Sequence, residues 1–432
     1  MTPAARLAAA IEVLAAIEAE RRPAADALKS WGLAHRFAGS GDRAAIAGLV
    51  YDGLRRRASS AFLMGDDTAR AVILGMLRRE RELDTEAIAR LADGSKYGPA
   101  ELSADERARL DAGSIGGAPP HIAGDYPEWL DPYFIRSFGD ARAEEGAALA
   151  SRAPLDLRVN TLKAERAAAA AMVADLKPEE TRWSPWGLRI RLAADARSPA
   201  IHAEPAFLKG LVEIQDEGSQ LAALFSGAKP GEQVLDLCAG AGGKTLALAA
   251  MMQNKGQIFA TDDDKRRLAP IHDRLKRSGA RNVQVRTPKS IGSEITDLAG
   301  RMDLVLIDAP CTGTGAWRRN PDAKWRMRPG ALEQRITEQA EILDRAVPLL
   351  KPGGRIVYVT CSVLDSENGT QVKAFISRHR DFSVQMPAEL TEALGDRSLV
   401  FAKAARLSDE GILMTPRTTD TDGFFVSVIK QR

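Results

Sequence analysis

A buried apolar run that ends in a glycine-rich turn does most to limit the folds open to this chain. Residues 234–238 (Val-Leu-Asp-Leu-Cys) have the composition of a buried strand, and a glycine-rich turn at 239–245 leads into a helical stretch near Leu246. A strand, a glycine turn and a helix in this order are typical of the ligand-binding unit of a doubly wound sheet. Short apolar strands alternate with helical segments after residue 206, which predicts an α/β Rossmann-like domain there.

The turn could bind a nucleoside triphosphate, a dinucleotide or S-adenosylmethionine. A phosphate-binding P-loop ending in Gly243-Lys244-Thr245 would need glycine at position 238, where this chain has Cys238. Asp262 follows the next predicted strand, residues 256–260, and an acid there can accept hydrogen bonds from the ribose of NAD or of S-adenosylmethionine. The turn and the acid alone leave these two cofactors open.

Two of the three cysteines follow predicted strands. Residues 302–307 lead into Asp308-Ala309-Pro310-Cys311, and residues 355–359 lead into Thr360-Cys361-Ser362. Ligands of open parallel sheets bind outside the carboxyl ends of the strands, so both thiols and Asp308 are expected beside the glycine turn. Cys238 is interpreted as a small buried residue whose backbone touches the cofactor. The five histidines show no paired ligand spacing, so no metal site is predicted.

Methylation of a poorly nucleophilic ring carbon needs such a set of groups. Carbon 5 of cytosine becomes nucleophilic when a thiolate adds to carbon 6. A carboxyl group near ring nitrogen N3 stabilises the charge that develops there, and a base then removes the carbon 5 proton. Asp308 and Cys311 are the available groups, but this chemistry does not say which of the two thiols attacks.

A second cluster indicates RNA binding. Residues 317–328 combine four arginines, a lysine and two tryptophans directly after the Cys311 turn. Cationic side chains can neutralise phosphates and aromatic faces can stack on bases. The alternative is a surface loop with a buried Trp325. The arginines at 55–57 lie in a helical region with apolar spacing, and a solvated helix face explains them as well as RNA contact does.

Several motifs, in order along the chain, resemble the RsmB/Sun family of RNA 5-methylcytosine methyltransferases. The turn at 236–245 is similar to the cofactor loop of the family, residues 308–311 to its fourth motif and residues 360–362 to its sixth. Weaker matches cover 158–161, an RNA-handling element; 215–220, the entry to the catalytic domain; and 318–325, the segment after the fourth motif.

The resemblance implies roles for individual residues. Cys361 would attack carbon 6 and Cys311 would assist breakdown of the covalent adduct, with Asp308 as the third catalytic group. The implied cofactor is S-adenosyl-L-methionine, with contacts from Cys238, Ala239, Gly240, Ala241, Gly242, Gly243, Lys244, Asp262 and Asp308. The candidate RNA contacts are Arg158, Asn160, Arg318, Arg319 and Lys324.

The expected architecture is multidomain. A chain of 432 residues exceeds one ordinary core, and the Gly- and Pro-rich stretch between 113 and 140 favours a break. The resemblance implies an all-α NusB-like RNA-binding domain (1–115), a linker (116–150), a small α+β, RRM-like RNA-handling module (151–205) and a Rossmann-like class I methyltransferase domain (206–432).

The expected function is S-adenosylmethionine-dependent methylation of carbon 5 of a cytosine in RNA. The NusB-like extension favours 16S rRNA; tRNA and a catalytically inactive RNA-binding assembly factor are the alternatives. A nicotinamide-dependent oxidoreductase would leave the two thiol motifs unexplained. Arg6 and Glu12 interrupt the N-terminal apolar stretch and no run is long enough to span a membrane, so a cytoplasmic protein is expected.

Two positions depart from the family pattern. Ala241 stands where most members have proline, which loosens the turn without removing a contact. The family usually carries an Asp after the third strand that contacts adenine, and residues 285–290 (Val-Arg-Thr-Pro-Lys-Ser) contain none. Cofactor affinity below that typical of the family is therefore expected.

Overall fold

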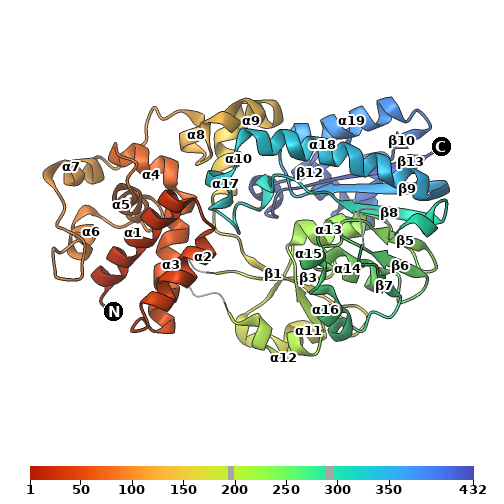
Figure 1. Cartoon of the computed structure of the whole chain (residues 1–432), viewed down its shortest axis with the longest axis horizontal. Coiled ribbons are helices and arrows are strands. Elements are labelled where there is room, and N and C mark those ends of the chain that lie inside the picture. The colour runs from red at the N-terminus through yellow and green to blue at the C-terminus, as the bar shows by residue number, and fades with distance from the viewer. Residues whose placement is uncertain (193–198, 289–294) are drawn as a thin grey trace. The chain divides into compact units, whose positions relative to one another are not determined.

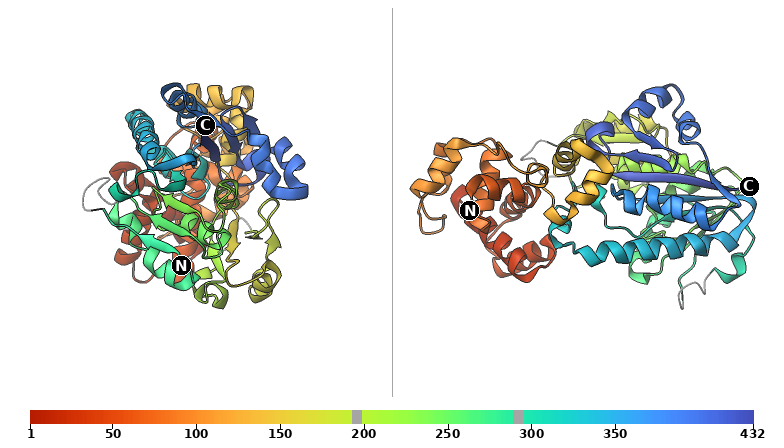
Figure 2. Two further views of the ribbon diagram at one scale, coloured as in Figure 1. Left: turned by 90° about the vertical axis from the view of Figure 1, so that its right-hand side faces the viewer. Right: turned by 90° about the horizontal axis from the view of Figure 1, so that it is seen from above.

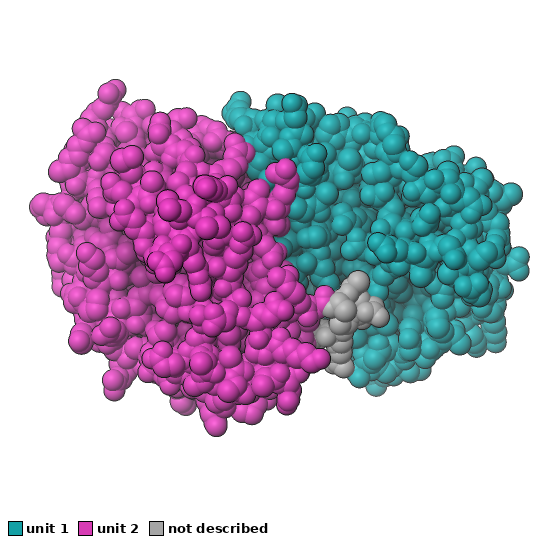
Figure 3. All heavy atoms as spheres, turned by 180° about the vertical axis from the view of Figure 1, so that it is seen from behind, with its two compact units in different colours: residues 1–153, 193–197, 317–328 teal, residues 154–192, 198–316, 329–432 magenta. Residues whose placement is uncertain are grey.

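The structure is a computed structural model that describes residues 1–192, 199–288 and 295–432. Internal contacts divide the chain into two compact units, which Figure 3 colours separately. Unit 1 comprises residues 1–153 and 317–328, and unit 2 comprises the described residues of 154–316 and 329–432. The segment 317–328 therefore belongs to unit 1 by its contacts, although its neighbours in sequence on both sides belong to unit 2.

Unit 1 is built from helices (Figure 1). Helix α1 begins after Thr2, whose hydroxyl accepts the Ala5 N–H at 3.1 Å. Ser103 and Glu106 form a capping box at the start of α7. The helices are α1 (Pro3–Glu20), α2 (Ala24–Ala34), α3 (Ser40–Arg55), α4 (Arg57–Met64), α5 (Ala69–Arg79), α6 (Thr85–Leu91), α7 (Ala104–Ala112), α8 (Pro120–Ala123), α9 (Asp131–Phe138), α10 (Arg142–Leu149) and α17 (Ala323–Arg326), with short 3₁₀ turns η1 (Glu128–Leu130) and η2 (Gly139–Ala141).

Residues 116–150 form helices rather than the expected linker. Tyr126 and Phe134 are fully buried and stack with their ring centroids 4.2 Å apart. The prolines that suggested a break stand at helix starts: Pro120 is the first residue of α8, and α9 has Pro132 in its first turn. Proline is tolerated there because the first N–H groups of a helix have no partner within it.

Unit 2 contains a small antiparallel sheet with strand order β2-β3-β1-β4. Its elements are β1 (Leu155–Val159), α11 (Arg166–Met172), η3 (Ala174–Leu176), β2 (Glu179–Glu180), β3 (Gly187–Ile190), η4 (Ile201–Ala203), α12 (Pro205–Leu208) and β4 (Val212–Ile214). Leu157, Leu188 and Val212 are buried in its core together with Ala169 of α11. Because β4 pairs with β1, this α+β module extends past residue 205.

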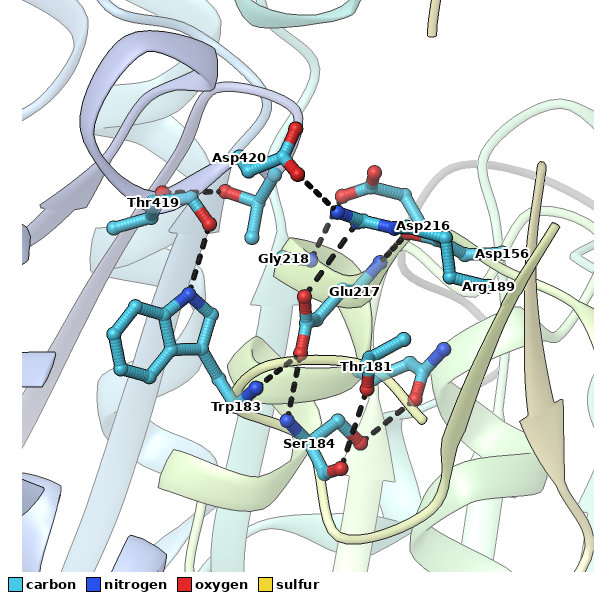
Figure 4. Close-up of polar contacts among 12 residues, drawn as sticks. Asp156, Thr181, Trp183, Ser184, Arg189, Asp216, Glu217, Gly218, Thr419 and Asp420 are labelled. Atoms are coloured by element: carbon cyan, nitrogen blue, oxygen red, sulfur yellow. Dashed lines mark hydrogen bonds and ion pairs between the residues drawn. The ribbon is translucent and has the colours of Figure 1, made fainter. Parts of the chain in front are cut away.

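Buried charges join the small sheet to the rest of unit 2 (Figure 4). The guanidinium of Arg189 on β3 donates to both carboxylate oxygens of Asp156, each at 2.7 Å, and to Asp420 at 2.7 Å. The carboxylate of Glu217, at the start of α13 (Glu217–Phe225), accepts the N–H groups of Trp183 and of the residue after it. These paired groups are nearly all buried, so each charge keeps partners that replace water.

The large sheet of unit 2, over its described residues, has the order β7-β6-β5-β8-β9-β13-β12-β11, and β10 pairs with β13. Strands β5 to β9 run parallel, and β13, between β9 and β12, runs antiparallel to both. The strands are β5 (Gln233–Asp236), β6 (Gln257–Ala260), β7 (Val283–Val285), β8 (Met302–Asp308), β9 (Leu350–Thr360), β10 (Phe382–Val384), β11 (Arg406–Ser408), β12 (Gly411–Met414) and β13 (Phe424–Gln431). The sequence order reverses between β5 and β8, which marks the ligand-binding switch point of such sheets.

Helices cover both faces of the large sheet, as Figures 1 and 2 show from three sides. Alternate strand residues face opposite ways: Leu304 and Leu306 pack with α13 and α14 (Gly243–Met251), whereas Val305 and Ile307 pack with α18 (Pro329–Ala346) and α19 (Gly369–Arg378). The α/β Rossmann-like fold expected after residue 206 is confirmed.

The remaining elements of unit 2 are short. They are α15 (Lys265–Leu268), α16 (Ile271–Ser278), η5 (Thr296–Leu298), η6 (Thr314–Ala316), η7 (Val347–Leu349), η8 (Asp365–Glu367), α20 (Pro387–Thr391), η9 (Glu392–Arg397), α21 (Ser398–Ala404) and α22 (Pro416–Thr419). Two of them, η6 and η8, come a few residues after Cys311 and Cys361 in the turns that follow β8 and β9, and they shape the site described next.

Candidate active site

The carboxyl ends of three neighbouring parallel strands bring the predicted groups together. Strand β5 ends at Asp236 before the glycine turn, β8 ends at Asp308, and β9 ends at Thr360 directly before Cys361. Strand β8 lies between the other two and runs parallel to both. The glycine turn, Asp308 and both thiols therefore emerge at one edge of the sheet.

The backbone of the glycine turn has conformations that require glycine. Gly240 and Gly242 have φ of 50° and 84°, in the left-handed region that other residues rarely adopt. A Cβ at Gly242 would lie 2.5 Å from Cγ1 of Ile271. The N–H of Ala239 donates to Thr261, which ties the turn to the end of β6. The turn is thus held in one shape by its own backbone and by α16.

Asp262 lies buried between the turn and the end of β6. One carboxylate oxygen accepts the N–H of Gly240 at 2.9 Å, and the other accepts the N–H of Asp264 at 2.9 Å. A carboxylate has about four acceptor positions, so Asp262 keeps capacity for two hydroxyl groups. The donor-lined turn and this acid fit the ribose of a nucleoside cofactor.

The adenine side of this site is described in part. Arg286 follows β7, its guanidinium lies over the ring of Phe259 at 4.5 Å, and it forms an ion pair with Asp297. The expectation that no acid follows the third parallel strand, β7, concerns residues 285–290. Residues 289 and 290 lie outside the described residues.

Lys244 contacts a predicted catalytic residue. Its ammonium lies 2.7 Å from Oδ2 of Asp308 and 5.1 Å from the ring centroid of Phe424. The Lys244 side chain is buried, whereas that of Asp308 is about one-third exposed. The lysine was expected among the cofactor contacts, but in the structure it links the cofactor turn to the end of β8.

The two thiols are in direct contact. The Sγ atoms of Cys311 and Cys361 lie 3.3 Å apart, and either can donate to the other. The hydrogen bond with Cys361, followed by burial, raises the pKa of Cys311 well above its usual value. Burial also raises the pKa of Cys238, which lies two residues after the end of β5. A buried thiol of this kind is inert.

Glu367 was not among the predicted site residues; it is fully buried beside both thiols. Its carboxylate accepts hydrogen bonds from Thr312, Gln339 and Ser362. In sequence it stands in the polar stretch Asp365-Ser366-Glu367-Asn368, which has the composition of an exposed turn. The only available signal was its position six residues after Cys361, and that spacing has no local meaning without the tertiary fold.

Two of the expected RNA contacts, Arg158 and Asn160, are buried within unit 2. The guanidinium of Arg158 donates to the side chain of Gln215 at 2.6 Å, and burial lowers its pKa to about 10. The Asn160 amide donates to the carbonyls of Gly210 and Ser278. Both side chains are buried and bonded to other parts of unit 2. The prediction that Arg158 and Asn160 contact RNA is therefore corrected.

Part of the segment 317–328 is buried in unit 1. Lys324 is fully buried, and its ammonium donates to the carbonyls of Arg55 at 2.9 Å and Asp125 at 2.6 Å. The indole N–H of Trp325 donates to the carbonyl of Leu54. Arg318 is 2% exposed, whereas Arg319 is half-buried. The expectation that Arg318 and Lys324 contact RNA is therefore corrected, because both are enclosed by protein.

Two classes of site are absent from the residues the structure describes. No cluster of three or more His, Cys, Asp or Glu side chains in this part of the chain could hold a metal ion. No helix within the same residues has the length and apolarity to cross a membrane.

Comparisons with known proteins agree with the site. A family model described as 16S rRNA methyltransferase RsmB/F matches residues 224–430. A probable ribosomal RNA small subunit methyltransferase B from Synechocystis sp. is 32% identical over 310 residues, which are 71% of this chain and 67% of the relative. The ribosomal RNA small subunit methyltransferase B of Salmonella newport is 38% identical over 59% of this chain and 58% of its own length.

A solved structure matches the fold of most of the chain. The crystal structure of a methyltransferase homologue from Pyrococcus horikoshii has a TM-score of 0.58 at 28% identity and covers 74% of this chain and all of its own. The alignments with the Synechocystis and Salmonella relatives cover about two thirds and three fifths of the length of those relatives, respectively. From the family model and from the Synechocystis relative, the chain belongs to the 16S rRNA methyltransferase RsmB/F family.

Proposed function

We propose that this protein methylates carbon 5 of a cytosine in small-subunit ribosomal RNA, with S-adenosylmethionine as methyl donor and Cys361 as covalent nucleophile. The observation that carries the proposal is the contact of 3.3 Å between the Cys311 and Cys361 sulfurs at the sheet edge that also carries Asp308. The names of the two bacterial relatives support ribosomal RNA as the substrate.

Cofactor binding is assigned to the glycine turn and its neighbours. The turn at 239–243 would contact the amino-acid part of S-adenosylmethionine through its backbone, and Asp262 would accept the ribose hydroxyls. When bound, the cofactor supplies an electrophilic methyl group on a sulfonium. Lys244 is assigned to Asp308 rather than to the cofactor, because its ammonium already pairs with that carboxylate.

The thiols act in sequence. The Cys361 thiolate adds to carbon 6, so a sulfur–carbon bond forms and the electrons of the 5,6 double bond make carbon 5 nucleophilic. Carbon 5 would then form a bond to the methyl carbon of the donor, and the electrons of the broken sulfur–methyl bond would stay on the donor sulfur, which leaves as a thioether. A base removes the proton from carbon 5, the double bond re-forms, and the Cys361 thiolate leaves. Cys311 is assigned to this last stage, since its sulfur touches the sulfur that must depart.

Asp308 binds the target cytosine during these steps. As the thiolate adds to carbon 6, ring nitrogen N3 takes up a proton from solvent, and it returns that proton when the adduct breaks down. The Asp308 carboxylate accepts hydrogen bonds from this N3–H and from the exocyclic amine, which stabilises the protonated ring. The Lys244 ammonium at 2.7 Å fixes the orientation of this carboxylate. The target cytosine has to leave its stack to reach these groups.

Residues 1–115 of unit 1 are proposed to be a NusB-like domain that assists RNA binding. The proposal is supported by the helical architecture of these residues. With Arg158, Asn160, Arg318 and Lys324 enclosed, half-buried Arg319 remains as a candidate RNA contact from the original set.

Methyl transfer and covalent-adduct formation test the proposal together. Wild type, Cys361→Ala and Cys311→Ala are incubated with labelled S-adenosylmethionine and naked 16S rRNA, with total tRNA as a parallel substrate. We expect methyl transfer by wild type, neither transfer nor adduct by Cys361→Ala, and accumulated adduct by Cys311→Ala. Transfer by Cys361→Ala overturns the nucleophile assignment, and activity on tRNA alone overturns the substrate.

A further inference from the structure

The turns that carry the two thiols are fastened to each other by a buried carboxylate. Glu367 in η8 has no exposed surface. One of its oxygens accepts the N–H of Thr312 at 2.8 Å, and the other accepts the hydroxyls of Thr312 and Ser362. Thr312 directly follows Cys311, and Ser362 directly follows Cys361. The same carboxylate therefore restrains the residue next to each thiol.

We propose that Glu367 is a positioning residue for the thiol pair: its carboxylate sets the Cys311 turn against the Cys361 turn and keeps the shared proton on Cys311. The inference rests on the proposed two-thiol reaction, in which Cys361 has to be the thiolate that attacks.

Further contacts make the position of Glu367 rigid. The amide of Gln339 on α18 donates to the carboxylate at 3.0 Å and to the carbonyl of Pro310 at 2.9 Å. The backbone carbonyl of Glu367 accepts the hydroxyl of Tyr358 at 2.7 Å. With donors on both oxygens and on its carbonyl, Glu367 cannot turn toward solvent without leaving several buried donors unpaired.

Bonds across the two turns transmit this restraint to the sulfurs. The hydroxyls of Thr314 and Ser362 are 3.0 Å apart, and the N–H of Gly315 donates to the carbonyl of Cys361 at 2.9 Å. The Sγ contact of 3.3 Å is thus the result of a bonded pair of turns. If the turns separated by 1 Å, the thiols would no longer share a proton, because sulfur hydrogen bonds weaken rapidly with distance.

The charge of Glu367 adds to the raised pKa of Cys311. A negative group favours the neutral form of a nearby thiol. The pKa of Cys311 is raised first by its hydrogen bond with Cys361, then by burial and by the charge of Cys361, and further by the Glu367 carboxylate. A protonated Cys311 can donate its S–H to the Cys361 sulfur across the contact of 3.3 Å.

Thiol alkylation tests this role without RNA or cofactor. Purified wild type and Glu367→Gln are treated with iodoacetamide between pH 6 and 10, and the modification of Cys311 and Cys361 is followed by mass spectrometry. In wild type we expect Cys361 to react first. In Glu367→Gln we expect the Cys361-to-Cys311 rate ratio to fall severalfold, with Cys311 reacting at lower pH because it loses a nearby negative charge.

Glu232→Gln is the matched control. Glu232 pairs with Arg355 and directly precedes β5, so it lies at the opposite end of that parallel strand from the site. The same chemical change there should leave both alkylation profiles as in wild type. If folded Glu367→Gln has the wild-type ratio and pH profile, or if Glu232→Gln shifts them equally, the proposal is overturned.

If Glu367→Gln does not unfold cooperatively, and so is not a properly folded protein, Thr312→Val is tested in its place. It removes one hydroxyl donor to Glu367 and keeps the backbone donor, and a smaller fall of the ratio in the same direction is expected; an unchanged ratio overturns the proposal. Methyl transfer is measured in parallel. Wild type that shows the expected thiol selectivity but transfers no methyl group contradicts the proposed function and leaves the role of Glu367 standing.

Discussion

The ammonium of Lys244 lies 2.7 Å from a carboxylate oxygen of Asp308. Lys244 stands in the first turn of α14, directly after the glycine turn, and Asp308 is the last residue of β8. A single ion pair therefore connects the cofactor turn to the strand that leads to Cys311. Because the lysine is buried and the acid is partly exposed, the pair can orient the carboxylate toward a substrate base.

Lys244→Met should impair catalysis more than cofactor binding. Loss of the ammonium frees the Asp308 carboxylate to rotate, and we expect kcat to fall by roughly 100-fold or more, as for other losses of a positioned catalytic group. The Kd for S-adenosylmethionine should change little. Initial rates and calorimetric titration measure the two effects. A large rise in Kd with unchanged kcat would place Lys244 on the cofactor instead.

Lys351→Met is the control for that substitution. Lys351 pairs with Asp303 at 2.8 Å, at the start of β8, so the same type of ion pair is removed at the opposite end of the strand. We expect kcat close to that of wild type.

Gly242→Ala should abolish cofactor binding while leaving the fold intact. Its φ of 84° is unfavourable for alanine, and the added Cβ would lie 2.5 Å from Ile271. The turn must therefore deform by more than its donors can tolerate. Calorimetry should show no measurable binding of S-adenosylmethionine. Gly330→Ala in α18, where nothing lies within 4 Å of the new Cβ, is the control, and equal loss of binding there would contradict the argument.

Arg189→Met should be strongly destabilising. The substitution leaves Asp156 and Glu217 as buried carboxylates without their cation, and removal of one partner of a buried ion pair costs about 3–5 kcal/mol. Urea denaturation followed by tryptophan fluorescence measures the free energy of unfolding. Arg191→Met removes exposed ion pairs on the same chain segment and should cost about 1 kcal/mol or less. Equal effects of the two substitutions would be inconsistent with the buried network.

Lys324 should make the stability of unit 1 depend on pH in the alkaline range. Burial lowers its pKa to about 7, whereas an unfolded lysine has a pKa of about 10.4. Between these values the unfolded state binds more protons than the folded state, so the free energy of unfolding rises with pH. Hydrogen exchange of unit 1 at pH 7 to 10 should show this rise in wild type and lose most of it in Lys324→Met. Parallel curves for the two proteins would refute the prediction.

The same Lys324→Met protein should bind RNA with an unchanged salt dependence. A lysine that neutralises a phosphate contributes to the slope of log K against log salt, by about 0.7 for single strands, and a buried lysine does not. Arg319, which is half-buried, is the matched comparison. A reduced slope in Lys324→Met, measured by filter binding at several salt concentrations, would show that the lysine reaches RNA after all.

Local sequence was sufficient for features that depend on neighbouring residues. The strand before Asp308, the strand before Cys361 and the turn at Gly242 are set by apolar runs and by a backbone that only glycine adopts easily. Parallel strand order then implies that their ends meet, and the structure brings the two thiols to 3.3 Å as this reasoning predicts. The linker predicted from the prolines at 120 and 132 was wrong, because proline occurs at helix starts as well as at breaks.

Burial of charged side chains could not be inferred from the local sequence. Lys324 and Arg318 stand in a basic segment, yet the Lys324 ammonium donates to the carbonyls of Arg55 and Asp125, far away in the chain. Arg318 is buried as well, and its backbone carbonyl accepts a hydrogen bond from the Arg55 guanidinium. Glu367 presents the opposite case, since a stretch with the composition of an exposed turn supplies a fully buried carboxylate. In each case the partner lies distant in sequence, and only the folded chain brings it within hydrogen-bonding distance.

The residues and their order along the chain set the chemistry available to this protein: a glycine turn for a cofactor, an acid after β6, and two thiols after two parallel strands. The folded structure sets which charges face solvent, which lysine pairs with Asp308 and which carboxylate bonds to both thiol turns. The physical reason is that backbone conformation follows from neighbouring residues, whereas desolvation and pairing of a charge depend on contacts that the sequence separates widely.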